Sequence, residues 1–213
     1  MKDPVQTQLI GIDWVTTRLR ALRIGSDGEV LEHRESDRGI AAIRDGEFDS
    51  ALQSLIGDWQ AVEREKIPII MCGMVGSRQD WREVPYCSCP ASLHDLVKDL
   101  QAIDTSLGPA WIVGGLSSTD ERGDHDILRG EEMQIFGVAS PMGQQVIVAA
   151  GTHSKWALVR DLSIERFHTY MTGELYATLK QHSILGWLMQ GEATARGSPE
   201  DDMSSLEGGA ALA

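Results

Sequence analysis

The chain has 213 residues, 42% of them hydrophobic, which is enough for one large domain or two small ones around a real core. Its formal net charge of −13 argues against a nucleic-acid or anionic-membrane partner, because both favour a basic surface. No apolar run approaches the ~20 residues needed to span a bilayer. The first residues, Met1 to Pro4, lack the apolar region of a signal peptide, so we expect a cytoplasmic location.

Three strands are predicted in succession near the N-terminus, and the pattern then changes to a helix. Residues 9–14 are apolar, residues 18–24 alternate polar and apolar with period two, and a Ser-Asp-Gly turn leads into residues 30–34. Residues 48–62 place apolar side chains on one helical face. A short buried strand over residues 67–71 completes a strand–helix–strand unit, which indicates an α/β fold.

Beyond residue 80 the chain predicts short alternating elements. Pro85 and Pro90 indicate irregular or hairpin-like structure over 81–90. The polar composition after residue 189 predicts a weakly ordered tail at 190–213. The elements expected between these segments are a helix at 93–103, a strand at 111–116 ending in a turn at 117–119, a polar loop at 120–126, a helix at 127–138, a strand–turn–strand unit at 146–159, a strand at 164–168 and an amphipathic helix at 173–189.

One pattern occurs twice: an apolar strand, a tight turn rich in small and hydroxyl side chains, and a second strand. The polar or small residues of these turns are Asp13, Thr16 and Thr17 in the first, and Gly151, Thr152, His153, Ser154 and Lys155 in the second. Turns of this kind aim backbone N–H groups and hydroxyls at one point, which suits a phosphate. Two of them in one chain indicate two lobes that hold a nucleoside triphosphate between them.

Each turn also has a simpler explanation. The Asp13 carboxylate can hold hydrated Mg²⁺ beside phosphate oxygens, or it can cap a hairpin turn. In the second turn, Gly151 permits close backbone approach and Lys155 offers a point charge for phosphate. The same residues suit an ordinary type I′ or II′ hairpin. The residues alone leave both alternatives open at both turns.

Two further polar segments are candidates for substrate chemistry. In the Arg-Gly-Glu-Glu sequence at 129–132, one carboxylate can act as general base toward a substrate hydroxyl, or both can stabilise a helix dipole. Ser77, Arg78 and Gln79 follow the strand expected at 67–71, at the sheet edge where ligands bind in open α/β folds. Arg78 can hold a carboxylate through two parallel hydrogen bonds, or it can be a solvated surface side chain.

The three cysteines of the chain are Cys72, Cys87 and Cys89. The spacing of the last two is too short for the usual C-x₂-C metal knuckle, and the chain has no second pair. Reduced structural thiols are the simplest interpretation, and a redox or metal role is the alternative.

The motifs occur in a characteristic order along the chain. They are Asp13-Trp14-x-Thr16-Thr17 with Leu19-Arg20-Ala21, Gly73-Met74-Val75-Gly76-Ser77-Arg78-Gln79 with Trp81 and Pro85-Tyr86, Arg129-Gly130-Glu131-Glu132, Gly151-Thr152-His153-Ser154-Lys155-Trp156, Met171-Thr172-Gly173-Glu174-Leu175 and His182-Ser183-Ile184-Leu185. Together they resemble the 2-dehydro-3-deoxygalactonokinase family of sugar-acid kinases. The resemblance extends from about residue 9 to about residue 189, and several long motifs make it specific.

The resemblance implies an α/β fold of the actin/hexokinase/Hsp70 (ribonuclease H-like) ATPase type, with mixed sheets, flanking helices and ATP between two lobes. It implies a sugar-kinase lobe at 8–140 and the beginning of a nucleotide-binding lobe at 141–189, with the second lobe truncated. The implied reaction is phosphorylation of the 6-hydroxyl of 2-dehydro-3-deoxy-D-galactonate by ATP and Mg²⁺ in galactonate catabolism. The implied partners are the sugar acid and ATP, without nucleic acid or membrane, and formation of a homo-oligomer is left open.

The resemblance also implies roles for individual residues. The phosphate-binding set is Asp13, Thr16, Thr17, Gly151, Thr152, His153, Ser154 and Lys155, with Asp13 as the Mg²⁺ ligand. The sugar-acid ligands are Ser77, Arg78 and Gln79. Glu131 is the candidate catalytic base, with Arg129 beside it.

The chain departs from the family pattern at two points. Val15 stands where the first loop usually has glycine, which costs strain if that position has positive φ and blocks approach if it lies against a phosphate. Family members run to roughly twice a single-domain length, so the adenosine-binding segment is expected to be missing. The alternative function is therefore a catalytically inactive sugar-acid-binding module or a kinase remnant. A chaperone-like or cytoskeletal ATPase fits less well, since those proteins lack the 73–78 and 129–132 sequences.

Overall fold

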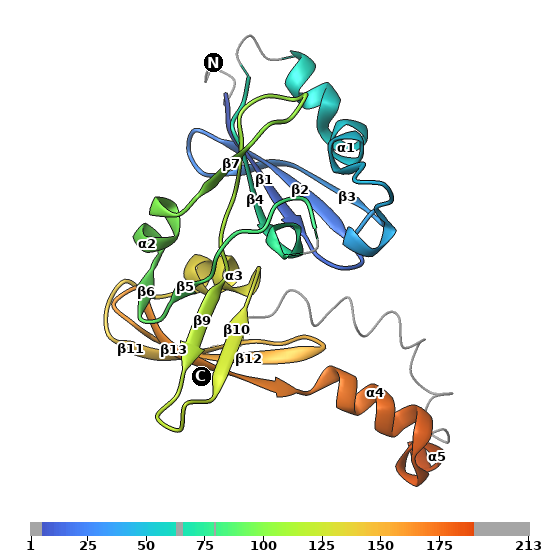
Figure 1. The fold of residues 1–213 in the computed structure, drawn as a ribbon, viewed down its shortest axis with the longest axis vertical. Coiled ribbons are helices and arrows are strands. Elements are labelled where there is room, and N and C mark those ends of the chain that lie inside the picture. Colours follow the sequence, from blue (N-terminus) through green and yellow to red (C-terminus); the bar gives the residue numbers. More distant parts are fainter. Residues whose placement is uncertain (1–5, 63–65, 79, 190–213) are drawn as a thin grey trace.

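The computed structural model describes residues 6–62, 66–78 and 80–189. The first part of the chain forms a six-stranded mixed sheet in the order β3-β2-β1-β4-β8-β7 (Figure 1). β1, β2 and β3 are antiparallel neighbours, whereas β4 and β8 run parallel to β1. These strands are β1 (Thr7–Trp14), β2 (Leu19–Gly25), β3 (Val30–Ser36), β4 (Ile69–Gly73), β7 (Gln101–Ile103) and β8 (Ala110–Ile112). The three opening strands and the mixed sheet that the sequence predicts are confirmed.

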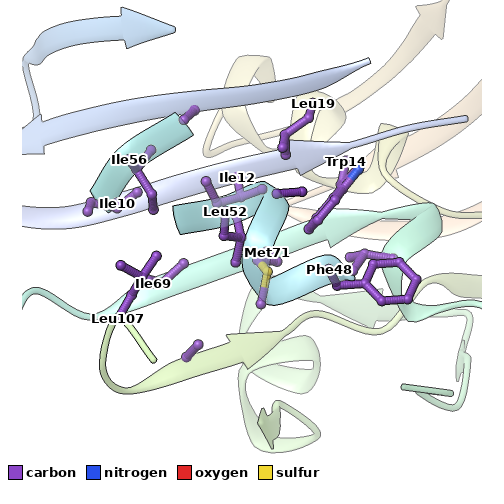
Figure 2. Packing of buried hydrophobic residues seen from close by; sticks show 14 of the residues in the cluster. Ile10, Ile12, Trp14, Leu19, Phe48, Leu52, Ile56, Ile69, Met71 and Leu107 are labelled. Atoms are coloured by element: carbon purple, nitrogen blue, oxygen red, sulfur yellow. The ribbon is translucent and has the colours of Figure 1, made fainter. Parts of the chain in front are cut away.

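Helix α1 (Phe48–Val62) covers one face of this sheet and closes the first core (Figure 2). Ile12 of β1 and Met71 of β4 point into that core and are at most 2% exposed. The Trp14 ring meets the Phe48 ring edge-on, with centroids 5.6 Å apart. Each such large apolar side chain contributes roughly 1.5–3 kcal/mol by leaving water. The helix expected from the apolar spacing at 48–62 is therefore confirmed with its bounds.

The remaining strands form a three-stranded sheet in the order β10-β9-β5 and a four-stranded sheet in the order β11-β12-β13-β6. Helices α2 and α3 pack with them around a second core, and α3 lies between this part and the six-stranded sheet (Figure 1). The elements are β5 (Cys87–Ser88), β6 (Ala91–Ser92), α2 (Leu93–Lys98), β9 (Leu116–Thr119), β10 (His125–Leu128), α3 (Glu131–Val138), β11 (Gln144–Ala149), β12 (His153–Arg160), β13 (Ser163–Met171), α4 (Gly173–His182) and α5 (Ile184–Met189), with short 3₁₀ turns η1 (Ile40–Ala42) and η2 (Met74–Gly76).

Strand β4 belongs to both cores. Successive residues of a strand face opposite sides of the sheet. Ile69 and Met71 therefore pack in the first core with α1, whereas Ile70 and Cys72 pack against the second core on the α3 side. A change at the carboxyl end of this strand is felt by both halves of the described chain.

Two expected elements in the middle of the chain are shorter than the sequence pattern indicates. The helix expected at 93–103 ends at Lys98, and its last residues instead pair with β8 as β7. The single strand expected at 111–116 is divided in the structure, because β8 ends at Ile112 and β9 begins at Leu116. The turn expected at 117–119 is part of β9. Gly114 separates the two strands, and a Cβ there would lie 2.6 Å from a neighbouring carbonyl oxygen. Close backbone packing at Gly114 therefore limits the strands on either side of it, and the spacing of apolar residues along the sequence does not reveal such packing.

The helix expected at 127–138 begins only at Glu131. Gly130 precedes it with φ 104°, a left-handed conformation that favours glycine and separates the helix from β10. β10 itself begins at His125, so the loop expected at 120–126 is shorter than predicted. The sequence does not fix these limits because glycine accepts either sign of φ.

The helix expected at 173–189 is two helices, α4 and α5, in the structure. Ser183 between them has extended backbone, with φ −130° and ψ 164°. The tail expected at 190–213 lies outside the described residues. Among the residues that are described, no helix is both long and apolar enough to cross a membrane.

The end of the described chain exposes many large apolar side chains, which we call the C-terminal apolar face. α4 and α5 extend away from the sheets (Figure 1), and α4 has no buried residue. Ile184 and Trp187 are 73% and 74% exposed. Exposed apolar surface on this scale favours association. The members of the face are Tyr170, Met171, Leu175, Tyr176, Leu179, Ile184, Leu185 and Trp187.

We expect the C-terminal apolar face to cause concentration-dependent association. Replacing Leu175, Ile184 and Trp187 together by serine should lower the sedimentation coefficient at high protein concentration and reduce the fluorescence of a hydrophobic dye. Met142→Ser, at an 80% exposed position in the turn before β11, is the control and should change neither. A parent chain that is monomeric and binds no dye would contradict the expectation.

Candidate functional site

The first turn is held by its own backbone and by η1. The Val15 N–H donates to the Arg18 carbonyl at 3.0 Å, which closes the hairpin between β1 and β2. The N–H groups of Ile40 and Ala41 donate to the carbonyls of Val15 and Thr16 at 3.0 and 2.9 Å. Val15 is not among the three non-glycine residues of the described chain with positive φ, so the strain considered for this position is absent.

Gly39 lets η1 approach this turn. A Cβ at position 39 would overlap the backbone of Thr16, Thr17 and Arg18. The Thr16 and Thr17 side chains themselves are exposed, at the carboxyl end of β1. The expected first phosphate loop is therefore a defined turn with two accessible hydroxyls.

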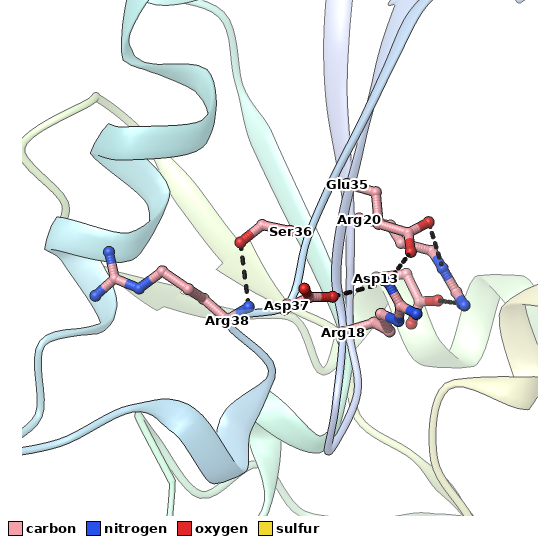
Figure 3. A network of polar contacts seen from close by, with 7 residues as sticks. All are labelled: Asp13, Arg18, Arg20, Glu35, Ser36, Asp37 and Arg38. Atoms are coloured by element: carbon pink, nitrogen blue, oxygen red, sulfur yellow. Dashed lines mark hydrogen bonds and ion pairs between the residues drawn. The ribbon is translucent and has the colours of Figure 1, made fainter.

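Asp13 lies at the end of β1 within a network of charged side chains (Figure 3). Its Oδ2 is 3.2 Å from Nη1 of Arg20, and Nε of Arg20 is 3.5 Å from Oε2 of Glu35. Arg18 continues the network to Glu35 and Asp37, each at 2.8 Å. Pairs this exposed contribute about 0–1 kcal/mol each. The network orients the Asp13 carboxylate more than it stabilises the fold.

Two glycines allow three backbone segments to meet beside Asp13. Gly73 ends β4 with φ 92°, and a Cβ there would lie 2.7 Å from the Trp14 carbonyl oxygen and 3.3 Å from Oδ1 of Asp13. A Cβ at Gly130 would lie 3.2 Å from the Cα of Gly73. The structure therefore brings the first turn and the 129–132 segment together at the carboxyl ends of β1 and β4, where ligands bind in α/β sheets.

Arg129 anchors this segment to the chain that precedes β5. Its Nη2 donates to the Val84 carbonyl at 2.8 Å, and its guanidinium lies 4.2 Å from the centre of the Tyr86 ring. Nη1 is buried without a hydrogen-bond partner, and a Cβ at Gly76 would lie 2.6 Å from it. The expected catalytic-site arginine therefore packs against η2, next to the expected sugar-acid loop.

The expected sugar-acid ligands follow η2. The Ser77 hydroxyl donates to the carboxylate of Asp80, and Arg78 is exposed. Gln79 lies outside the described residues. Arg78 thus has the freedom to meet a ligand, whereas the Ser77 hydroxyl already has a partner within its own loop.

The two glutamates of the 129–132 segment have different environments. Glu131 is partly exposed, and its Oε2 accepts a hydrogen bond from the Arg129 backbone N–H at 3.1 Å. Glu132 is fully buried: its Oε2 accepts from the Gly130 N–H at 2.6 Å, and its Oε1 has no partner. Burial raises the pKa of the Glu132 carboxyl to about 8. Sequence reasoning did not single out Glu132, because the phase of α3 decides which glutamate faces inward.

All three cysteines are reduced, which agrees with their interpretation as structural thiols. Burial is the main cause that raises the pKa of Cys72, with the carboxylates of Asp13 and Glu132 adding to it. Burial also raises the pKa of Cys89 to about 12. These thiols are therefore neutral at pH 7 and poor nucleophiles.

The second turn is shorter than expected because β12 already begins at His153. The start of α4 braces it. The Glu174 N–H donates to the Thr152 carbonyl at 3.1 Å, and a Cβ at Gly173 would lie 2.8 Å from the Gly151 carbonyl oxygen. His153 pairs with the Glu174 carboxylate through its ring.

The last two residues of the second motif are turned inward. The Ser154 hydroxyl bonds the Thr172 hydroxyl, and Lys155 is buried with its ammonium bonded within the protein. Gly151 and Thr152 are exposed. Backbone groups and the Thr152 hydroxyl are therefore the most accessible candidates for phosphate contact here.

The donor set at the first turn fits Mg²⁺ but does not form a protein cage. Among the described residues, no group of three His, Cys, Asp or Glu side chains is placed to hold a metal ion. Mg²⁺ commonly uses one or two carboxylates and completes its shell with water and substrate phosphates. The partly exposed Asp13 carboxylate, with the Thr16 and Thr17 hydroxyls nearby in the turn, suits that mode.

We expect Gly39→Ala to destabilise the protein by about 1–3 kcal/mol, because the added Cβ overlaps the first turn. Urea unfolding measures the change. Gly137→Ala is the matched control, since a Cβ there has no atom within 4 Å and lies on helix α3. A Gly39→Ala variant as stable as the parent would show that η1 does not fix the turn.

We expect Glu132→Gln to become progressively more stable than the parent as pH rises from about 4.5 to about 8. The folded parent keeps the Glu132 proton up to about pH 8, whereas the unfolded chain loses it near 4.5. The folded state therefore binds more protons in this window, and its free energy of unfolding falls by up to about 1.4 kcal/mol per pH unit relative to the variant. Urea unfolding of both proteins at several pH values measures this difference, which should be flat below pH 4; a pH-independent difference would contradict a buried neutral carboxyl.

Comparison with known proteins agrees with these motifs. The family model of 2-keto-3-deoxy-galactonokinase matches residues 13–210. A probable 2-dehydro-3-deoxygalactonokinase of Rhizobium meliloti (strain 1021) is 38% identical over 176 residues, which cover 82% of this chain and 56% of that protein. The 2-dehydro-3-deoxygalactonokinase of Escherichia coli (strain K12) is 35% identical over 177 residues, covering 83% of this chain and 58% of that protein. The chain thus spans somewhat over half the length of these relatives.

The fold is also similar to a solved structure. The crystal structure of a putative 2-dehydro-3-deoxygalactonokinase from Sinorhizobium meliloti superposes with a TM-score of 0.75 at 34% sequence identity. The match covers 92% of this chain and 66% of that one. The expected α/β fold with mixed sheets and flanking helices is confirmed, and the chain belongs to the 2-keto-3-deoxy-galactonokinase family of sugar-acid kinases.

Proposed function

We propose that this chain carries the sugar-acid site and part of the phosphate site of an ATP-dependent 2-dehydro-3-deoxygalactonokinase, which phosphorylates the 6-hydroxyl of 2-dehydro-3-deoxy-D-galactonate. The observation that supports this most directly is the meeting of Asp13, Gly73 and the 129–132 segment at one edge of the central sheet. The names of the relatives support the substrate class. A role in galactonate catabolism and a cytoplasmic location follow from the proposal.

The proposed ligand-binding roles rest on the position and exposure of each side chain. Asp13 would hold Mg²⁺, which would supply charge neutralisation for the triphosphate. Thr16 and Thr17 would contact phosphate from the first turn, and residues 151–154 from the second. Arg78, exposed after η2, would bind the sugar-acid carboxylate, with Ser77 and Gln79 beside it.

In the proposed reaction Glu131 accepts the proton of the 6-hydroxyl. The hydroxyl oxygen forms a bond to the γ-phosphorus, the bond from that phosphorus to the β–γ bridging oxygen breaks, and ADP leaves. Two features support Glu131 over Glu132: it is partly exposed, and its carboxylate is held by the Arg129 backbone N–H. Arg129 would position the segment through Val84 and Tyr86.

The lobe division remains part of the proposal. A boundary near residue 140 would place the first turn in the sugar-kinase lobe and the second in the nucleotide-binding lobe. The second core contains residues from both sides of that position, including Ile135 and Phe167. Each lobe would therefore depend on the other for its packing.

A sugar-acid-binding module without turnover is the second candidate function. The Arg20 guanidinium already pairs with the Asp13 carboxylate, and Ser154 already bonds Thr172. These contacts compete with metal and phosphate. The module would retain Arg78 as its carboxylate ligand.

We expect calorimetry to detect binding of both MgATP and 2-dehydro-3-deoxygalactonate to this chain, and a coupled assay to detect release of ADP by a full-length family member that carries these motifs. Arg78→Ala should lower the affinity for the sugar acid at least about tenfold, because a charge-assisted hydrogen bond is lost. Its affinity for MgATP should stay within about threefold of that of the parent. Asp13→Asn should lower the affinity for MgATP and leave the affinity for the sugar acid unchanged.

Asp27→Asn, which removes one carboxylate from the exposed turn between β2 and β3, is the control and should change neither affinity. Binding of the sugar acid without MgATP would favour the module. Binding of neither ligand would contradict both candidate functions.

A further inference from the structure

The lysine of the second motif, Lys155, points into the protein. It lies on β12 and is 9% exposed. Its Nζ donates to the carbonyl oxygen of Ile127 and to Oγ1 of Thr169, both at 2.8 Å. An ammonium has three donors and no acceptor, so two of its three donors are used inside the protein.

Thr169 extends this contact to a carboxylate. While its hydroxyl accepts from Lys155, it donates to Oδ1 of Asp126 at 2.7 Å. The Thr169 backbone N–H donates to Oδ2 of the same carboxylate at 2.6 Å. The Ile127 N–H completes the set with a 2.8 Å bond to Oδ1 of Asp126. A buried cation and a partly buried anion are thus joined through one hydroxyl.

This network bonds strands that share no backbone ladder in the described part of the chain. β10 pairs with β9, whereas β12 and β13 pair with each other in a separate sheet. β10 supplies Asp126 and Ile127, β12 supplies Lys155, and β13 supplies Thr169. The bonds therefore fix the three-stranded sheet relative to the four-stranded sheet.

The network also lies between the two candidate sites along the chain. β10 ends at Leu128, directly before the 129–132 segment that contains the candidate base. β12 begins at His153, directly after Gly151 and Thr152 of the second turn. A displacement of β10 relative to β12 would move one candidate site relative to the other.

We propose that Lys155 is a positioning residue that fixes the 129–132 segment relative to the second turn, and that it is not a phosphate ligand. That these two segments bind ligands rests on the proposed function. That Lys155 links β10 to β12 rests on the hydrogen bonds alone. If the ammonium left to reach a phosphate, the Ile127 carbonyl and the Thr169 hydroxyl would each lose a donor, and the Asp126 charge would lose its nearby cation.

Hydrogen exchange of the 213-residue chain tests the coupling without requiring activity. Lys155→Met keeps the length of the side chain and removes the ammonium. We expect the amides of residues 125–131 to exchange at least about tenfold faster, with those of α1 unchanged. Lys98→Met removes one lysine charge from an exposed position on α2 and should leave 125–131 unchanged. Lys155→Arg, which keeps a cationic donor, should restore part of the protection.

Ligand titration of the same variants tests the role. We expect Lys155→Met to bind MgATP within about threefold of the parent and 2-dehydro-3-deoxygalactonate at least about fivefold more weakly. A merely structural change would weaken both ligands together. A parent chain that binds neither ligand would sink the proposed function, and the exchange experiment would still decide whether Lys155 couples the two strands.

Two results would overturn the inference. One is unchanged exchange over 125–131 in Lys155→Met. The other is a loss of MgATP affinity of about tenfold or more while sugar-acid affinity is retained, which would make Lys155 a phosphate ligand. If Lys155→Met does not fold, Thr169→Val removes the linking hydroxyl and keeps the side-chain shape. Faster exchange over 125–131 in that variant supports the coupling, and unchanged exchange contradicts it.

Discussion

The site depends on one close approach of backbones at the carboxyl end of the central sheet. Gly73 and Gly130 both have left-handed φ, and no side chain separates the Trp14 carbonyl, Gly73 and Gly130. A Cβ at either glycine would push the 129–132 segment away from Asp13 and would also strain the backbone. The geometry of the candidate base and of the candidate metal ligand therefore follows from two residues that carry no chemistry of their own.

Charges are divided between the two sides of this contact. On the solvent side, Asp13 is paired with Arg20 and is close enough to the surface to exchange that partner for another cation. On the inner side, Glu132 is buried with one oxygen unpaired, and burial favours its neutral form. The neighbouring Glu131 stays partly solvated. Adjacent glutamates thus have different surroundings, one buried and one partly exposed.

The two cores are linked through β4 and α3, which contribute to the contact between them. β4 sends alternate side chains into both cores, and α3 packs against the second face of that strand. The bonds of Lys155 add a polar link between the two smaller sheets.

Local residue patterns were sufficient to predict much of the fold and to single out segments of the candidate site. The period-two and helical patterns predicted the opening strands and α1, and a short apolar run predicted the strand after α1, which packs against a core on both faces. The ordered motifs identified the family and singled out Asp13, Arg78 and the 129–132 segment. The same motifs predicted Lys155 as a phosphate ligand, since a lysine beside a glycine-containing turn is a common way to place a positive charge near phosphate.

What the sequence by itself determined about this protein is its family, its mixed α/β architecture and which segments are candidates for the site. Tertiary structure alone decided that α3 begins after Gly130, that Glu132 rather than Glu131 is buried, and that Lys155 faces Ile127 and Thr169. The physical reason is that these outcomes depend on backbone contacts and hydrogen bonds between residues far apart in the chain. Periodicity and turn composition report only on near neighbours.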